Sequence, residues 1–251
     1  MPKSRKSESK AESPKGGYFS WSREPAVGLF AVLPLWITYI LLRSQLAPEE
    51  RNGAEVLLLQ QLSLLGSRAH LVVSVAFVFL IAAAARWLLH HKVPWARVVA
   101  VIALEGLVYG VMLGPIAAAM TSSADRLLSI GAPVFGFDTT PMVANVVGSL
   151  GAGIFEELVF RLGLMSALTW LGMRAVREWG LPRVVAGLSA VLISALVFSW
   201  FHHLCGEPYE RGRFLFRTMA GVLLGFLMWW RGYGVCVYTH TVYDLYFYLR
   251  P

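Results

Sequence analysis

Charged residues are scarce in this chain, since only 15% of its 251 residues are Asp, Glu, Lys or Arg and 57% are hydrophobic. A soluble domain carries about 25% charged residues, so this composition excludes an ordinary soluble protein. No long polar linker interrupts the chain after residue 25. We therefore expect a single membrane domain over 26–251, preceded by a disordered basic tail over 1–25.

Cysteine is almost absent as well. Cys205 and Cys236 form no CxxC spacing, which argues against a disulfide framework and against a cysteine metal site. Acidic residues are outnumbered, with 15 Asp and Glu against 22 Lys and Arg. We interpret this positive excess as a sign of contact with anionic lipid, and we expect no nucleic-acid partner.

Long apolar runs dominate instead, and they predict an all-α, polytopic transmembrane bundle of about seven spans. A further stretch at 54–66 is too short and too polar to cross, so it predicts an interfacial helix. Lys and Arg favour a cytoplasmic amino terminus, and the tail lacks transit-peptide character, which favours a bacterial inner membrane. The spans are predicted at 26–42, 69–89, 96–120, 141–172, 184–204, 213–230 and 233–249.

Three charges stand close together within the fourth span. Each ionised side chain near the middle of a bilayer costs roughly 2.5 to 3.5 kcal/mol, so such charges need partners or a function. Glu157 and Arg161 are four residues apart, a helical spacing that predicts an ion pair. Glu156 projects from a different face and must find its partner on another helix. We therefore expect Glu156 to carry the chemistry.

Two histidine segments share this apolar background. His202 and His203 close the fifth span, and His240 lies four residues before Asp244 in the last, on the same helical face. Carboxylates and histidines from three helices predict a general-base site in which Glu156, bonded to His202, takes a proton from water. Counted along the spans, however, His240 lies nearer the inner side than Glu156, so we expect the turn at 231–234 to dip into the membrane.

In order along the chain, these motifs resemble those of the CAAX protease and bacteriocin-processing family of intramembrane glutamic endopeptidases. The motifs read Glu156-Glu157-Leu-Val-Phe-Arg161, Phe198-Ser-Trp-Phe-His202 and His240-Thr-Val-Tyr-Asp244. The resemblance covers about 140–250, the expected catalytic core. It implies a peptide hydrolase that needs no cofactor and acts on a membrane-associated protein or peptide.

The resemblance also implies roles for individual residues. Glu156 and His202 would activate water, while His240 and Asp244 would polarise the scissile carbonyl and hold the oxyanion. The prenyl-protein branch of the family has Asn where this chain has Asp244. Because an ionised Asp would repel an oxyanion, Asp244 either is protonated or orients His240. Glu157 and Arg161 would shape the site. We expect Phe198, within the second motif, and His203, beside His202 near the membrane interface, to be supporting residues as well.

Other functions stay open on the sequence alone. The same acids and histidines, joined by Glu105, would also suit a proton relay in a proton-coupled transporter. A non-catalytic immunity or scaffold protein of the same fold is a third possibility. The ligand types also suit zinc, but no HExxH motif is present, so we expect no metal. Glu105 matches no motif, and we expect a structural role in which it faces the same cavity or pairs with Arg161.

Overall fold

The computed structural model describes residues 17–46, 53–62, 69–128 and 141–248, and all regular structure within them is helical. The elements are α1 (Tyr18–Trp21), α2 (Pro25–Arg43), α3 (Gly53–Leu62), α4 (Ala69–His90), α5 (Trp95–Leu128), α6 (Met142–Gly151), the π-helix η2 (Ala152–Met165), α7 (Ser166–Glu178), α8 (Arg183–Leu204), α9 (Arg211–Arg231) and α10 (Tyr233–Tyr248).

Five stretches of the described chain are long and apolar enough to cross a membrane. They are α2, α5, the continuous run α6–η2–α7, α8 and α9. The prediction of an all-helical, polytopic bundle is confirmed, and the chain is an integral membrane protein. The helices predicted at 69–89 and 233–249 are present as α4 and α10 but are not among these five. The interfacial prediction at 54–66 coincides in part with α3, and residues 63–66 lie outside the described residues.

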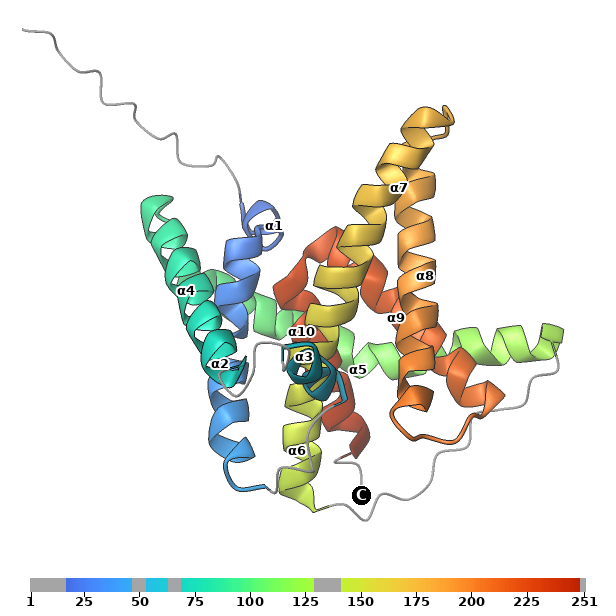
Figure 1. The fold of residues 1–251 in the computed structure, drawn as a ribbon, viewed down its shortest axis with the longest axis horizontal. Helices are drawn as coiled ribbons and strands as arrows, with labels where there is room; N and C mark the ends of the chain where they lie inside the picture. The colour runs from blue at the N-terminus through green and yellow to red at the C-terminus, as the bar shows by residue number, and fades with distance from the viewer. Residues whose placement is uncertain (1–16, 47–52, 63–68, 129–140, 249–251) are drawn as a thin grey trace, which may run out of the picture.

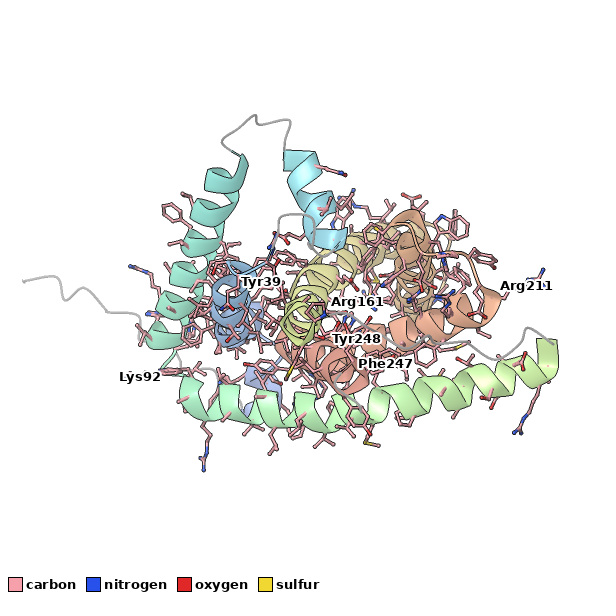
Figure 2. The ribbon with its side chains drawn as sticks, turned by 90° about the horizontal axis from the view of Figure 1, so that it is seen from below. Tyr39, Lys92, Arg161, Arg211, Phe247 and Tyr248 are labelled. Carbon is pink, nitrogen blue, oxygen red and sulfur yellow. The ribbon has the colours of Figure 1, made fainter. Side chains whose placement is uncertain are left out.

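Helix α10 occupies the centre of the bundle. It contacts α2, α5, α6, α9 and η2, and all its residues from Tyr233 to Thr241 are buried. In Figure 1, α2, α7 and α8 stand upright while α5 runs across them. Figure 2 shows α5 following one edge of the molecule, with Arg161 near the middle. The polar side chains of α10, such as His240, are thus shielded from lipid by the neighbouring helices.

Glycines allow neighbouring helices to approach α10 closely. A Cβ at Gly106 of α5 would lie 2.3 Å from the Cβ of Tyr238, and one at Gly153 of η2 would lie 2.0 Å from Oγ1 of Thr241. Close approach along the fourth predicted span is therefore present at Gly153. It is absent at Gly148, where an added Cβ meets no described atom within 4 Å.

Gly106→Ala is expected to lower the free energy of unfolding by about 1–3 kcal/mol, because the added methyl group overlaps α10 and forces the helices apart. Thermal unfolding of the detergent-solubilised protein measures the effect. Gly148→Ala is the matched control, and we expect it to raise stability by about 0.5–1 kcal/mol, because it removes a flexible helical glycine without a clash. Equal stability of the two variants would contradict the α5–α10 packing.

The expected boundary of the tail at residue 25 needs correction. Residues 17–25 are folded as α1 and the start of α2, and Ser22 is fully buried. The Arg23 Nε donates to the Trp230 carbonyl at 2.7 Å. The remainder of the predicted tail, residues 1–16, lies outside the described residues.

The connection between α9 and α10 is one residue, Gly232, with φ of 89°. An added Cβ there would lie 2.6 Å from the Ser22 carbonyl oxygen and the backbone is left-handed, so only glycine fits without strain. Arg231, just before it, is fully buried. Because the turn lies inside the protein beneath α1, α10 begins within the bundle and brings His240 to the level of Glu156.

Glu105 does not pair with Arg161, contrary to one of the two expectations. Its Oε2 accepts from Arg231 Nη2 at 2.8 Å and from the Tyr18 hydroxyl at 2.7 Å. Burial, reinforced by the neighbouring Glu105 carboxylate, raises the pKa of Tyr18 above its usual value, so Tyr18 remains a neutral donor. The cluster joins α1, α5 and the end of α9, in keeping with the structural role expected for Glu105.

Candidate active site

The two adjacent carboxylates lie on η2, where the helix has π geometry from Ala152 to Met165. Such segments are rare and are frequently found at functional sites. Glu157 Oε1 lies 3.1 Å from Arg161 Nη1, and both side chains are buried, with exposed fractions of 0% and 1%. The predicted i, i+4 ion pair is thus observed, and it neutralises two of the three buried charges locally.

Glu156 faces away from that pair, toward α8 and α10. Its Oε2 lies 3.8 Å from Nε2 of His202 and 3.9 Å from Nε2 of His240. The side chain of Glu156 is 6% exposed, against 25% for His202. The structure therefore brings together one carboxylate and two imidazoles from three separate elements, as the sequence predicted.

The orientation of His202 is set by its own helix. Its Nδ1 lies 3.0 Å from the carbonyl oxygen of Phe198, one turn earlier. A carbonyl oxygen only accepts hydrogen bonds, so Nδ1 carries the hydrogen and, in the neutral ring, Nε2 carries the lone pair. The ring therefore presents an acceptor nitrogen to Glu156.

His240 is oriented by Glu157, a contact that the sequence did not reveal. Nδ1 of His240 lies 2.6 Å from Oε1 of Glu157, whose Oε2 accepts from the Cys236 Sγ at 3.0 Å. Asp244 Oδ2 lies 3.7 Å from the other ring nitrogen, Nε2. Glu157, and not Asp244, therefore fixes the His240 ring through Nδ1. The Asp244 and Glu156 carboxylates both lie near the other ring nitrogen, Nε2, which faces the site.

Glu157→Gln is expected to lower kcat by about 100-fold. Without the charge of Glu157 the His240 ring should shift, and a displacement of about 1 Å of a group in an active site has an effect of this size. KM should change little, since Glu157 is fully buried and out of reach of a substrate. Steady-state kinetics of the purified variant in proteoliposomes separate the two constants. An unchanged kcat would show that Glu157 has no positioning role.

Phe198 forms the wall between these groups. The Arg161 guanidinium carbon lies 4.2 Å from the centre of the Phe198 ring. The same ring makes edge contacts with His202 and His240, at centroid distances of 4.9 and 6.0 Å. Phe198 thus packs between the Arg161 guanidinium and the two imidazole rings.

His203, the remaining predicted supporting residue, is not part of this cluster. Its Nδ1 lies 3.3 Å from the Glu207 carbonyl oxygen, and its ring packs against Tyr209 and Phe214. It faces the connection between α8 and α9, because successive residues on a helix point in different directions. Among the described residues, no group of three or more His, Cys, Asp or Glu side chains is placed to hold a metal ion.

Two arginines of α9 stand beside the site, and the sequence analysis did not single them out. Glu207 forms ion pairs with Arg213, at 2.7 Å, and with Arg217. Burial alone would raise the pKa of Glu207, but the hydrogen bond and charge of Arg217, aided by Arg213, outweigh it and hold the pKa below its usual value. Ionised Glu207 therefore fixes Arg217 at a position where its charge interacts with His202 and Asp244.

Comparison with known proteins gives a family match for the carboxyl-terminal part of the chain. Residues 138–246 match the model of a family described as type II CAAX prenyl endopeptidase Rce1-like. Over these residues the chain is similar to the Rce1-like family. The resemblance predicted from the motifs is thereby confirmed, and the family indicates a CAAX-type intramembrane protease. No curated protein and no solved structure matched the chain.

The Rce1-like region contains every residue of the cluster described above, from Glu156 on η2 to Asp244 on α10. Helices α1 to α5 lie outside the match. They nevertheless contribute to the site indirectly, because α5 packs along α10 and supplies Glu105 to the buried Arg231.

Proposed function

We propose that this protein is a glutamic-type intramembrane endopeptidase that hydrolyses a peptide bond of a membrane-associated protein or peptide with water activated by Glu156 and His202. The supporting observation is the convergence of Glu156 Oε2 with the two imidazole Nε2 atoms at 3.8 and 3.9 Å. These separations exceed a direct hydrogen bond and suit a water molecule bridging the groups.

The proposed first step is attack of water on the scissile carbonyl. A water between Glu156 and His202 donates one hydrogen to each, because the carboxylate and the Nε2 lone pair of a neutral His202 both accept. Glu156 takes a proton as the oxygen of water bonds to the carbonyl carbon. The same proton then passes to the leaving amine as the C–N bond breaks, which returns Glu156 to its starting state.

The oxyanion formed in this step needs a donor, and His240 is placed for this role. Because its Nδ1 faces Glu157, Nε2 carries a hydrogen only when the ring is an imidazolium. Glu157 and Asp244 flank the ring and balance that charge. The fixed dipoles of such a dry site stabilise developing charge more strongly than water does. Asp244 thereby stabilises the oxyanion indirectly, by favouring the protonated form of His240 that donates to it.

The proposal is tested by comparing the termini of membrane proteins by mass spectrometry in cells that produce the wild type or Glu156→Gln at equal levels. We expect one or a few proteins to lose a processed terminus in the variant, and the lost termini give the cleavage motif. The comparison thus also decides between prenylated tails and leader or sorting peptides. Glu178→Gln, at an exposed position of α7, is the matched control and should leave every terminus unchanged.

Identical termini in both strains would contradict proteolysis. If the variant then still showed a phenotype, substrate-dependent proton flux in liposomes would support the transporter alternative. If Glu156→Gln left the phenotype of the cells intact, the non-catalytic scaffold or immunity function would be supported.

A further inference from the structure

The hairpin of α7 and α8 extends beyond the rest of the bundle, as Figure 1 shows. The continuous run from Met142 to Glu178 has 37 residues, whereas about 20 are enough to cross a bilayer. The tip of this hairpin, where Gly180 turns the chain with φ of 66°, therefore reaches past the hydrocarbon core toward the lipid headgroups.

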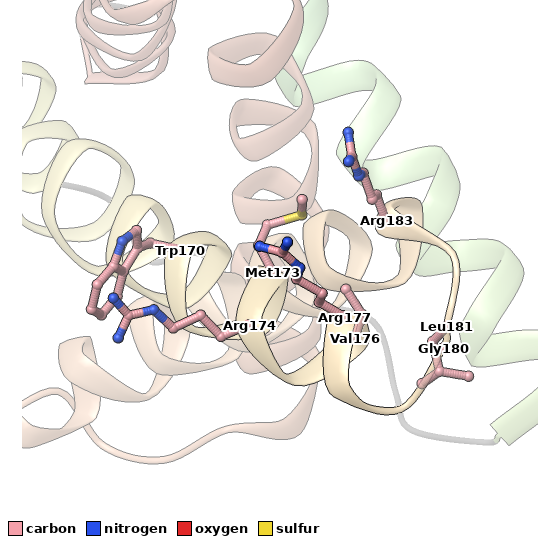
Figure 3. A pocket seen from close by; sticks show the side chains of 8 residues that line it. All are labelled: Trp170, Met173, Arg174, Val176, Arg177, Gly180, Leu181 and Arg183. Atoms are coloured by element: carbon pink, nitrogen blue, oxygen red, sulfur yellow. The ribbon is translucent and has the colours of Figure 1, made fainter.

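Three exposed arginines line one cavity at this tip. Arg174 and Arg177 come from the last turns of α7, and Arg183 is the first residue of α8. Together with apolar side chains they line a cavity of about 550 Å³ (Figure 3), a volume typical of ligand sites. In the described part of the chain, none of the three forms an ion pair with a carboxylate. The lining of the cavity thus holds three arginines and no carboxylate.

One of these guanidinium groups is held in place. The Arg174 Cζ lies 3.7 Å from the centre of the Trp170 ring, and Figure 3 shows the two side chains side by side. Stacking of this kind leaves the edge of the guanidinium, with its N–H donors, open to an anion. Arg183 is also the first residue of α8, so the positive end of that helix dipole lies at the cavity, which favours an anion further.

An apolar groove adjoins the basic cavity. It has a volume of about 360 Å³, shares Trp170 with the cavity, and is otherwise formed mainly by apolar side chains that include Met165, Val191, Met228 and Trp229. A positive cavity beside an apolar groove matches the two parts of a phospholipid. A free phosphate ion would use the first and leave the second empty.

We propose that this paired site binds one anionic phospholipid, with the headgroup phosphate among Arg174, Arg177 and Arg183 and a hydrocarbon chain in the groove beside Trp170. Guanidinium groups bind phosphate oxygens in pairs of parallel hydrogen bonds, which gives geometric selectivity as well as charge. Basic pockets between membrane helices are suited to such headgroups. The site shares no residue with the active site, so it does not depend on the proposed catalytic function.

The test uses the full-length protein, purified in detergent micelles that contain equal amounts of phosphatidylglycerol and phosphatidylcholine. Native mass spectrometry counts the lipids that remain bound. We expect the wild type to retain phosphatidylglycerol in preference to phosphatidylcholine. The triple variant Arg174→Gln, Arg177→Gln, Arg183→Gln should bind it on the order of 100-fold more weakly, since each arginine near an anionic headgroup contributes about fivefold.

A matched triple control removes the same charge at the exposed positions Arg86, Arg97 and Arg126 by substitution with Gln, and it should retain the lipid. Equal retention by both triple variants would overturn the proposal. The Arg174→Gln, Arg177→Gln, Arg183→Gln variant has the same net charge as the control. Loss of lipid in that variant alone therefore supports binding at this cavity over attraction by the overall charge of the protein. Matching thermal midpoints of the two show that the loss is not a failure to fold.

Two further experiments distinguish a specific phospholipid site from a general attraction of anions. The triple variant Arg174→Lys, Arg177→Lys, Arg183→Lys keeps the charge and loses the paired hydrogen bonds, so we expect retention between those of the wild type and the Gln variant. Retention equal to the wild type would show that charge alone is responsible. Displacement of phosphatidylglycerol by millimolar inorganic phosphate would show a free-phosphate site. Either result would overturn the proposal.

Discussion

Glu156→Gln is expected to lower kcat for peptide hydrolysis by about 10² to 10⁴-fold, the usual contribution of general acid–base catalysis. The amide keeps the size of the side chain but cannot take the proton of the attacking water. KM should change little, because Glu156 is buried and contacts the two imidazoles. The measurement is steady-state kinetics in proteoliposomes, with a peptide that spans the junction found by comparing termini.

His202→Ala provides the internal check on this result. If Glu156 and His202 hold the same water, the double variant should be about as inactive as either single variant, because residues that act as a unit show non-additive losses. Additive losses would separate the two residues and contradict a shared water. Turnover of Glu156→Gln close to that of the wild type would contradict the mechanism altogether.

Arg231→Met is expected to destabilise the protein by about 3–5 kcal/mol, the usual consequence of removing one partner of a buried ion pair. Arg231 is fully buried and pairs with Glu105, which is 19% exposed. Its guanidinium also lies 4.4 Å from the centre of the Phe19 ring in α1. In a chain of this size the loss corresponds to a fall in thermal midpoint of roughly 10–15 °C. Unfolding in detergent, followed by tryptophan fluorescence, measures it.

The double variant Glu105→Leu, Arg231→Met should recover most of the lost stability, because replacing both partners by apolar groups avoids an uncompensated buried charge. Arg86→Met, at an exposed position of α4, is the control and should leave the free energy of unfolding within about 0.5 kcal/mol of that of the wild type. A midpoint for Arg231→Met equal to that of the control would show that the pair does not stabilise the α9–α10 connection.

Local geometry explains which site contacts could be predicted from the sequence. The Glu157–Arg161 pair lies within one helical turn, so its partners were fixed by spacing and were found at 3.1 Å. The bond between Glu157 and His240 was not predictable, since it joins residues 83 positions apart on separate helices. For the same reason, the choice of Arg231 and not Arg161 as the partner of Glu105 required the packing of α5 against the α9–α10 turn.

Packing also decided which small residues matter. The sequence could not distinguish Gly148 from Gly153, because both are glycines in the same span. Only Gly153 faces α10 closely enough for an added Cβ to meet Thr241, while Gly148 faces no described atom within 4 Å. Likewise, α1 is a single turn among polar residues, and its folding depends on contacts with Glu105 and Arg231 that the local pattern does not contain.

The sequence by itself determined that this is a helical membrane protein, and it predicted that Glu156, His202 and His240 lie close together. Lipid offers no hydrogen bonds, so apolar composition requires helices, and isolated charges within them require partners. Only the tertiary structure decided which atoms meet. The nitrogen that faces Glu156 depends on Glu157 holding His240 from the opposite side, and on a buried turn at Gly232 that sets the depth of α10.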